Sequence, residues 1–145
     1  MVIAGRAVTV YNPATMHPQR FGARAEYREK QRQRVSDSST LADAFQKLKS
    51  LKVEFEHYDP EGTTKNNKVK YEVNVQNAKS VFRFDCSNSE CVGGDFDLTD
   101  QIAKAVAARK SVAKGEVVCQ GWRSRTTINS VRCGNIFRYK LSFGY

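Results

Sequence analysis

Long apolar runs are missing from this chain of 145 residues. A membrane-spanning helix needs about 18 consecutive apolar residues, and no stretch of the sequence approaches that length. Arg6 interrupts the apolar N-terminal residues too early for a secretory signal peptide. We therefore expect a cytoplasmic protein with no membrane partner.

Recognisable catalytic motifs are missing as well. Of the two histidines, His57 lies in an alternating strand pattern and nothing near it in the sequence makes a catalytic pair with it, so we interpret it as an ordinary strand residue. No motif of a nucleophilic serine, a zinc-protease helix or a phosphate-binding loop is present. We expect that the protein is not an enzyme. The alternative is a thiol-dependent enzyme, which needs a cysteine whose pKa is lowered by a nearby cation or histidine.

Acidic residues are scarce towards the C-terminus. Residues 101–145 hold nine basic residues and one acidic residue, Glu116, which gives +8. Residues 1–38 hold seven basic and three acidic residues (+4), and residues 39–100 hold eight basic and eleven acidic residues (−3), for a net charge of +9. Such an excess of positive charge at both ends attracts polyanions, nucleic acids above all. The alternative is a positive surface that only keeps the protein soluble.

The sequence divides into a basic N-terminal arm, residues 1–38, and one folded domain, residues 39–145. The arm contains Asn-Pro and His-Pro pairs, a long polar run and no extended apolar period. Such a composition is typical of irregular chain, so we expect the arm to be flexible.

Hydrophobic periodicity predicts the elements of the domain. A helix is expected over residues 40–50, with Thr40 capping its first turn. Three strands with alternating apolar residues are expected at 52–59, 68–76 and 81–86, then a second helix over 98–110 capped by Asp97. A hairpin of residues 116–122 and 131–143 ends the chain. We therefore predict an α+β domain of order α-β-β-β-α-β-β, with an antiparallel sheet of about five strands and two helices on one face.

The order α-β-β-β-α over residues 40–110 resembles the double-stranded-RNA-binding domain in outline. That family grips phosphate with a lysine-rich start to its second helix. Here the corresponding residues are Asp97-Leu98-Thr99-Asp100, whose carboxylates repel phosphate. We therefore do not extend the family's binding mode to this chain.

All four cysteines lie in the last 60 residues, with the spacing C-x4-C, 27 residues, then C-x13-C. Cys86 and Cys91 bracket a loop, and the predicted hairpin places Cys119 opposite Cys133. Two close pairs at strand ends are typical of a tetrahedral thiolate zinc site, which with four protein ligands is structural. The alternatives are buried free thiols, or the disulfides 86–91 and 119–133, which an oxidising compartment would favour.

Basic and aromatic residues interleave in the final hairpin, and single-strand-binding proteins combine cationic grooves with exposed aromatic platforms. We predict a small zinc-stabilised nucleic-acid-binding protein, for RNA or DNA. The alternative is a non-enzymatic interaction or structural subunit of a larger protein assembly. The predicted nucleic-acid contacts are Arg28, Lys30, Arg32 and Arg34 of the arm and Trp122, Arg123, Arg125, Arg132, Arg138 and Lys140 of the hairpin.

Overall fold

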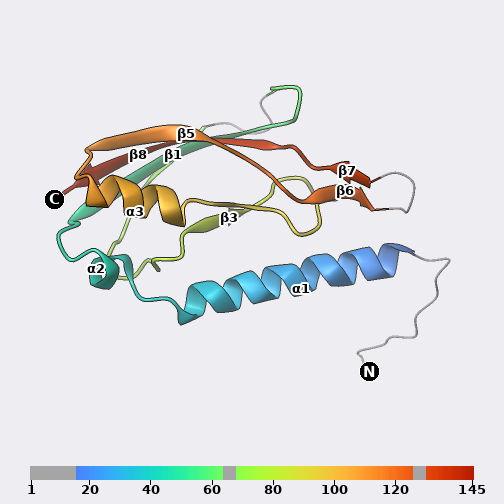
Figure 1. Ribbon diagram of the computed structural model, residues 1–145, viewed down its shortest axis with the longest axis horizontal. Coiled ribbons are helices and arrows are strands. Elements are labelled where there is room, and N and C mark those ends of the chain that lie inside the picture. Colours follow the sequence, from blue (N-terminus) through green and yellow to red (C-terminus); the bar gives the residue numbers. More distant parts are fainter. Residues whose placement is uncertain (1–15, 64–67, 126–129) are drawn as a thin grey trace.

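A computed structural model describes residues 16–63, 68–125 and 130–145, without the side chains of residues 16–21, 124, 125 and 130. An antiparallel sheet of four strands forms one side of the molecule, and the helices lie on the other side (Figure 1). The predicted α+β class is therefore confirmed. The sheet has four strands rather than about five, because two further strand pairs stand apart from it.

The sheet has the strand order β2-β1-β8-β5. Its central pair is β1 (Ser50–Tyr58) and β8 (Ile136–Gly144), which run side by side over nine residues. Strand β2 (Val69–Val73) adds to β1 at one edge, and β5 (Val112–Val118) adds to β8 at the other. The alternating apolar residues of the two central strands bury one face of this sheet and leave the other face to charged residues.

The third predicted strand does not join the sheet. Strand β3 (Arg83–Asp85) pairs instead with β4 (Asp95–Asp97), a segment that the sequence pattern placed in a loop. After β2 the chain turns inward and bonds to the start of α2, since the amides of Leu41 and Ala42 donate to the carbonyls of Ala78 and Val75. This crossing carries β3 to the inner side of the sheet. The three-strand meander behind the resemblance to the double-stranded-RNA-binding domain is therefore absent from the described residues.

The predicted C-terminal hairpin is also divided. Strands β6 (Trp122–Arg125) and β7 (Ser130–Arg132) form a separate two-stranded ribbon. The chain leaves this ribbon through Gly134, whose φ of 69° favours glycine, and then enters β8. The strand predicted at 116–122 therefore ends at Val118, and the one predicted at 131–143 is interrupted at Cys133–Asn135.

Two helices cover the inner face of the sheet (Figure 1). Helix α2 (Leu41–Ala44) is a single turn, capped as expected by the Thr40 hydroxyl, which accepts from the amide of Asp43 at 3.1 Å. It is shorter than the predicted 40–50 because the amide of Lys49 already bonds to Gly144 of β8. Helix α3 (Thr99–Ala107) buries Ile102 and Ala105, and Asp97 accepts from the amide of Thr99.

The N-terminal arm, which we expected to be irregular, is the segment for which prediction and structure differ most. Residues Met16–Asp37 form a 22-residue helix, α1, which runs along the side of the molecule opposite the sheet (Figure 1). Its stability comes from local polar pairs, such as Arg32 with Glu29 at 2.5 Å and Arg34 with Gln31 at 3.0 Å. Residues 1–15 of the predicted arm lie outside the described residues.

Candidate metal centre

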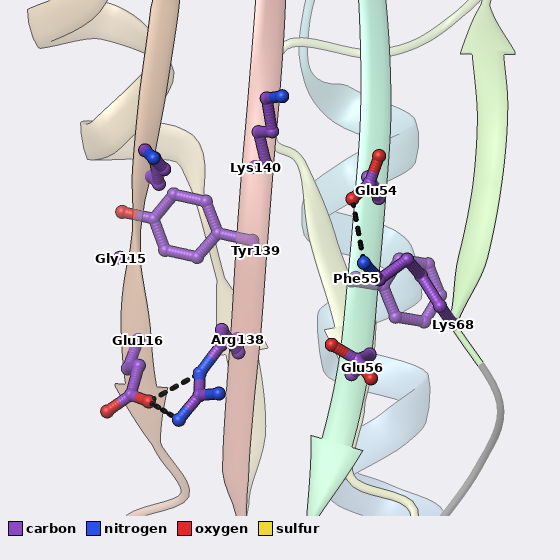
Figure 2. Close-up of a pocket in the computed structure, with 10 residues that line it drawn as sticks. Glu54, Phe55, Glu56, Lys68, Gly115, Glu116, Arg138, Tyr139 and Lys140 are labelled. Carbon is purple, nitrogen blue, oxygen red and sulfur yellow. Dashed lines mark hydrogen bonds and ion pairs between the residues drawn. The ribbon is translucent and has the colours of Figure 1, made fainter.

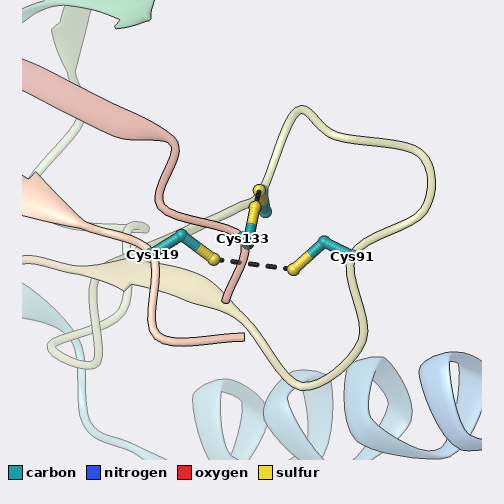
Figure 3. A group of neighbouring side chains, drawn as sticks. Cys91, Cys119 and Cys133 are labelled. Carbon is teal, nitrogen blue, oxygen red and sulfur yellow. Dashed lines mark hydrogen bonds between the residues drawn. The ribbon is translucent and has the colours of Figure 1, made fainter. Parts of the chain in front are cut away.

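The four cysteines come together at one buried point. Their sulfur atoms all lie within 4.8 Å of one another, and each side chain is at most 4 % exposed. The closest approaches are 3.5 Å, between Cys86 and Cys133 and between Cys91 and Cys119 (Figure 3 draws the second). A zinc ion with Zn–S bonds of about 2.3 Å requires sulfurs about 3.8 Å apart. The cluster therefore has nearly the size of a tetrahedral thiolate site and is compatible with a bound metal.

Strand ends position these thiols. Cys86 follows β3, Cys119 follows β5 and Cys133 follows β7, each as the first residue after its strand. Cys91 completes the set from the loop between β3 and β4. The expected proximity of Cys119 and Cys133 is confirmed, since the amide of Cys119 donates to Asn135 and that of Gly134 donates to Cys119. The centre thus ties together three segments of the chain.

Amide groups surround the sulfurs. The backbone amide of Gly121 donates to the sulfur of Cys119 at 3.4 Å, and the side-chain amide of Asn88 donates to that of Cys133 at 3.7 Å. The backbone amide of Asn88 also donates to Cys86. Such donors stabilise thiolates and orient metal ligands, and they are common around structural thiolate sites.

Two glycines make room for the cluster. A Cβ at Gly121 would lie 2.5 Å from the sulfur of Cys91, and one at Gly94 would collide with the sulfur of Cys119. Both glycines follow a cysteine by two or three residues in the sequence. A glycine two or three residues after a cysteine is therefore a second sequence pattern, besides the cysteine spacing, that indicates a cysteine centre.

The thiols of the cluster differ in acidity. Hydrogen bonds from Cys119 and Cys91 lower the pKa of the Cys86 thiol. Hydrogen bonds to Cys86 and Cys91, together with burial, raise the pKa of Cys119. The pKa of Cys91 is raised too, because its hydrogen bond from Cys119 is outweighed by the one to Cys86 and by burial. Four thiolates so close together therefore require a cation between them.

The alternatives to a metal find less support in this geometry. The sulfurs are too far apart for disulfide bonds of about 2.05 Å, and all four cysteines are free. The closest pairs are 86 with 133 and 91 with 119, not the pairs 86–91 and 119–133 of the disulfide hypothesis. Cysteines that serve only as small apolar residues would gain nothing from four sulfurs facing one another.

His57 lies in the core beside this centre. It is 8 % exposed, and the rings of Phe55, Phe96 and Phe137 surround it at centroid distances of 5.2–5.6 Å. Burial lowers its pKa, although the nearby Cys86 opposes the shift. Its Nδ1 has no hydrogen-bond partner among the described residues. It lies on β1, which confirms its interpretation as a strand residue.

Most of the predicted nucleic-acid contacts on α1 are already engaged within the molecule. Arg28 lies 3.9 Å from Asp85, Arg34 is 3.0 Å from Asp97, and Arg32 pairs with Glu29 of its own helix. Lys30 is exposed, with no ion pair among the residues that the structure describes.

The predicted hairpin contacts are dispersed over two surfaces. In the β6–β7 ribbon, Arg132 stacks on the ring of Trp122 at 4.0 Å and donates to the carbonyl of Gln120. Arg123 lines a cavity of about 410 Å³ whose wall includes Asp59, Glu61 and Glu90, a poor environment for phosphate. Arg125 ends β6, and its side chain is outside the described part.

The other two hairpin cations, Arg138 and Lys140, lie on the exposed face of the sheet. Arg138 is occupied by Glu116 at 2.6 Å, as Figure 2 shows, and lies over the ring of Tyr58. Lys140 is directly opposite Lys114 of β5. The neighbouring Glu54 is bound by Lys68 at 3.3 Å and lies 4.0 Å from Lys70, and no ion pair to Lys140 or Lys114 is found among the described residues (Figure 2).

Lys114 and Lys140 belong to a group of exposed cations that we call the lysine end, of which the sequence predicted only Lys140 as a nucleic-acid contact. Three of its members lie around the last residues of β8: the amide of Lys49 bonds to Gly144, the hydroxyl of Tyr145 donates to the carbonyl of Lys110, and Arg109 stacks on Tyr145 at 4.7 Å. The other three lie on β1, β5 and β8 of the sheet. Within the described chain, none of its six exposed cations forms an ion pair. The lysine end comprises Lys49, Lys52, Arg109, Lys110, Lys114 and Lys140.

Comparison with known proteins identifies no relative for this chain. No family model, no curated protein and no solved structure matches it. In the described residues, no helix is both long enough and apolar enough to cross a bilayer.

Proposed function

We propose that this protein is a nucleic-acid-binding protein whose fold is stabilised by a structural zinc ion. Cys86, Cys91, Cys119 and Cys133 would hold the ion. With four protein ligands it has no position left for a substrate, so its role is to fix the ends of β3, β5 and β7. Nucleic acid binds on the protein surface, away from the metal.

The lysine end carries the binding part of this proposal. Lys114 and Lys140 face each other directly across β5 and β8, and like charges at such positions destabilise a sheet by roughly 0.2–1 kcal/mol. Neighbouring Glu54 is occupied by Lys68, which directly precedes β2, and lies close to Lys70 of β2, so it does not relieve this repulsion fully. A phosphate backbone lying over the pair neutralises both charges and releases its own counterions.

Charge reversal at Lys114 separates binding from stability. We expect Lys114→Glu to form an ion pair with Lys140 and raise the free energy of unfolding by roughly 0.2–1 kcal/mol. The same change should weaken binding to a short DNA or RNA by about tenfold or more and lower the dependence of affinity on salt. Denaturant unfolding and fluorescence anisotropy measure the two effects.

The matched control is Lys104→Glu, which makes the same change in net charge on α3, where Lys104 is exposed and forms no ion pair among the described residues. It should alter binding much less than Lys114→Glu. Equal losses for the two variants, or an affinity of the native protein that is indifferent to salt, would contradict the proposal. Copurification of a protein partner without nucleic acid would instead favour a structural subunit of an assembly.

A further inference from the structure

Helix α1 lies outside the hydrophobic core. No described residue of α1 belongs to the cluster of buried apolar side chains or to the half-buried residues packed against it. From Gly22 onward its described side chains are mainly charged or polar, and Tyr27 and Val35 are half-buried exceptions. The packing of an apolar helix face against the core, which holds most helices on a protein, is therefore nearly absent for α1.

Electrostatic contacts hold α1 instead. The β3–β4 ribbon presents Asp85, Asp95 and Asp97, and Arg83 neutralises them in part through bonds of 2.6 Å to Asp85 and 2.7 Å to Asp95. The helix approaches this acidic ribbon with two arginines, Arg28 at 3.9 Å from Asp85 and Arg34 at 3.0 Å from Asp97.

Tyr27 adds a third contact between the helix and the acidic ribbon. Its hydroxyl donates to Asp95, and burial together with that carboxylate raises its pKa to about 12.

The C-terminal end of α1 is attached more firmly. The amide of Ser80 donates to Ser39 at 2.7 Å, Lys79 donates to the carbonyl of Ser38, and Thr40 pairs with Lys79. The helix is thus tethered at residues 38–40. If its ion pairs break, it moves away from the ribbon without leaving the protein.

We infer that α1 is a displaceable basic helix, and that the phosphates of nucleic acid compete with the acidic ribbon for Arg28 and Arg34. This inference rests on the proposed function. The ribbon carboxylates occupy these arginines in the absence of nucleic acid and so restrain binding. The contacts that hold α1 are partly exposed ion pairs, which are individually weak and screened by salt.

A double-mutant cycle between Arg34 and Asp97 tests the competition. If nucleic acid must break this ion pair, Asp97→Asn removes a cost of binding and should tighten the affinity for a short DNA duplex by about two- to fivefold. Arg34→Gln in the native background loses a phosphate contact but also avoids that cost, so its effect is small. In the Asp97→Asn background there is no ion pair to break, so only the lost phosphate contact remains. Arg34→Gln should therefore weaken binding more in this background than in the native one.

Asp43→Asn is the matched control for charge. Asp43 is exposed and has no ion pair among the described residues, and its substitution changes the net charge equally. Asp97→Asn retains a side-chain oxygen for the amide of Thr99, and the melting temperature of each variant shows whether the fold persists. The distance between a label on α1 and a label on the β3–β4 ribbon follows undocking directly and should lengthen when the duplex is added to the native chain.

The outcomes separate the two proposals. Absence of duplex and single-strand binding by the native chain would overturn the proposed function and this inference with it. Binding with an unchanged distance between α1 and the β3–β4 ribbon, an additive cycle, or equal effects of Asp97→Asn and Asp43→Asn would overturn the inference alone.

Discussion

Gly121 shows how closely the backbone is fitted around the cysteine cluster. An added methyl group would lie 2.5 Å from the sulfur of Cys91, and the amide that now donates to Cys119 would have to move. We expect Gly121→Ala to lower zinc affinity by about 10–100-fold, the range found when groups that orient metal ligands are changed. Competition with a chromophoric chelator measures the affinity.

Gly22→Ala is the control for that substitution. Gly22 lies on α1 with nothing within 4 Å of an added Cβ. Alanine is a better helix former than glycine by about 1 kcal/mol, so helix content should rise while zinc affinity stays the same. An unchanged zinc affinity in Gly121→Ala would show that the cluster is not a metal centre of this geometry.

At the residue scale, the sequence predicted the cysteine cluster but not its surroundings. The spacing of the four cysteines favoured a common site, with buried free thiols and disulfides as the alternatives. The amide donors Asn88 and Gly121 were not identified, because their contacts depend on how two distant loops cross. The lysine end was missed because summing charge along the chain placed Lys49 and Lys52 in a segment of net negative charge.

At the element scale, α1 is expected to be dispensable for the fold. It contributes no residue to the core and is held by exposed ion pairs worth roughly 0–1 kcal/mol each. A chain that starts at Ser38 should therefore unfold cooperatively, with a loss of less than about 3 kcal/mol and an unchanged zinc content. Circular dichroism during denaturant unfolding measures both helix loss and stability. Loss of cooperative unfolding would contradict the peripheral role of α1.

Periodicity predicted the long central strands and failed for the short elements. The alternation in β1 and β8 spans nine residues and identifies the buried face correctly. Strand β4 has three residues, Asp95–Asp97, and its pairing with β3 exists because the chain crosses beneath the sheet. Helix α1 has no apolar period, so its polar sequence was interpreted as irregular chain.

At the scale of the whole molecule, the cysteine centre and the exposed cations are two distinct features. The cysteine centre joins the ends of β3, β5 and β7, and so connects both two-stranded ribbons to the main sheet. The cations that we propose to contact nucleic acid divide into the lysine end and α1, the second of which is opposed by the acidic ribbon. The first feature explains how the fold is held, and the second explains how a polyanion would be recognised.

The metal centre is the claim on which the rest of the account depends. A structural thiolate site contributes about 10–16 kcal/mol of apparent binding free energy, far more than any single surface contact in this fold. It should therefore be occupied in protein purified without added metal.

The most direct test is the metal content of that protein, combined with X-ray absorption spectroscopy of the bound ion. The account predicts one zinc ion per chain, with four sulfur ligands at about 2.3 Å. Protein that is folded and metal-free, or that contains the cysteines as disulfides, would contradict it.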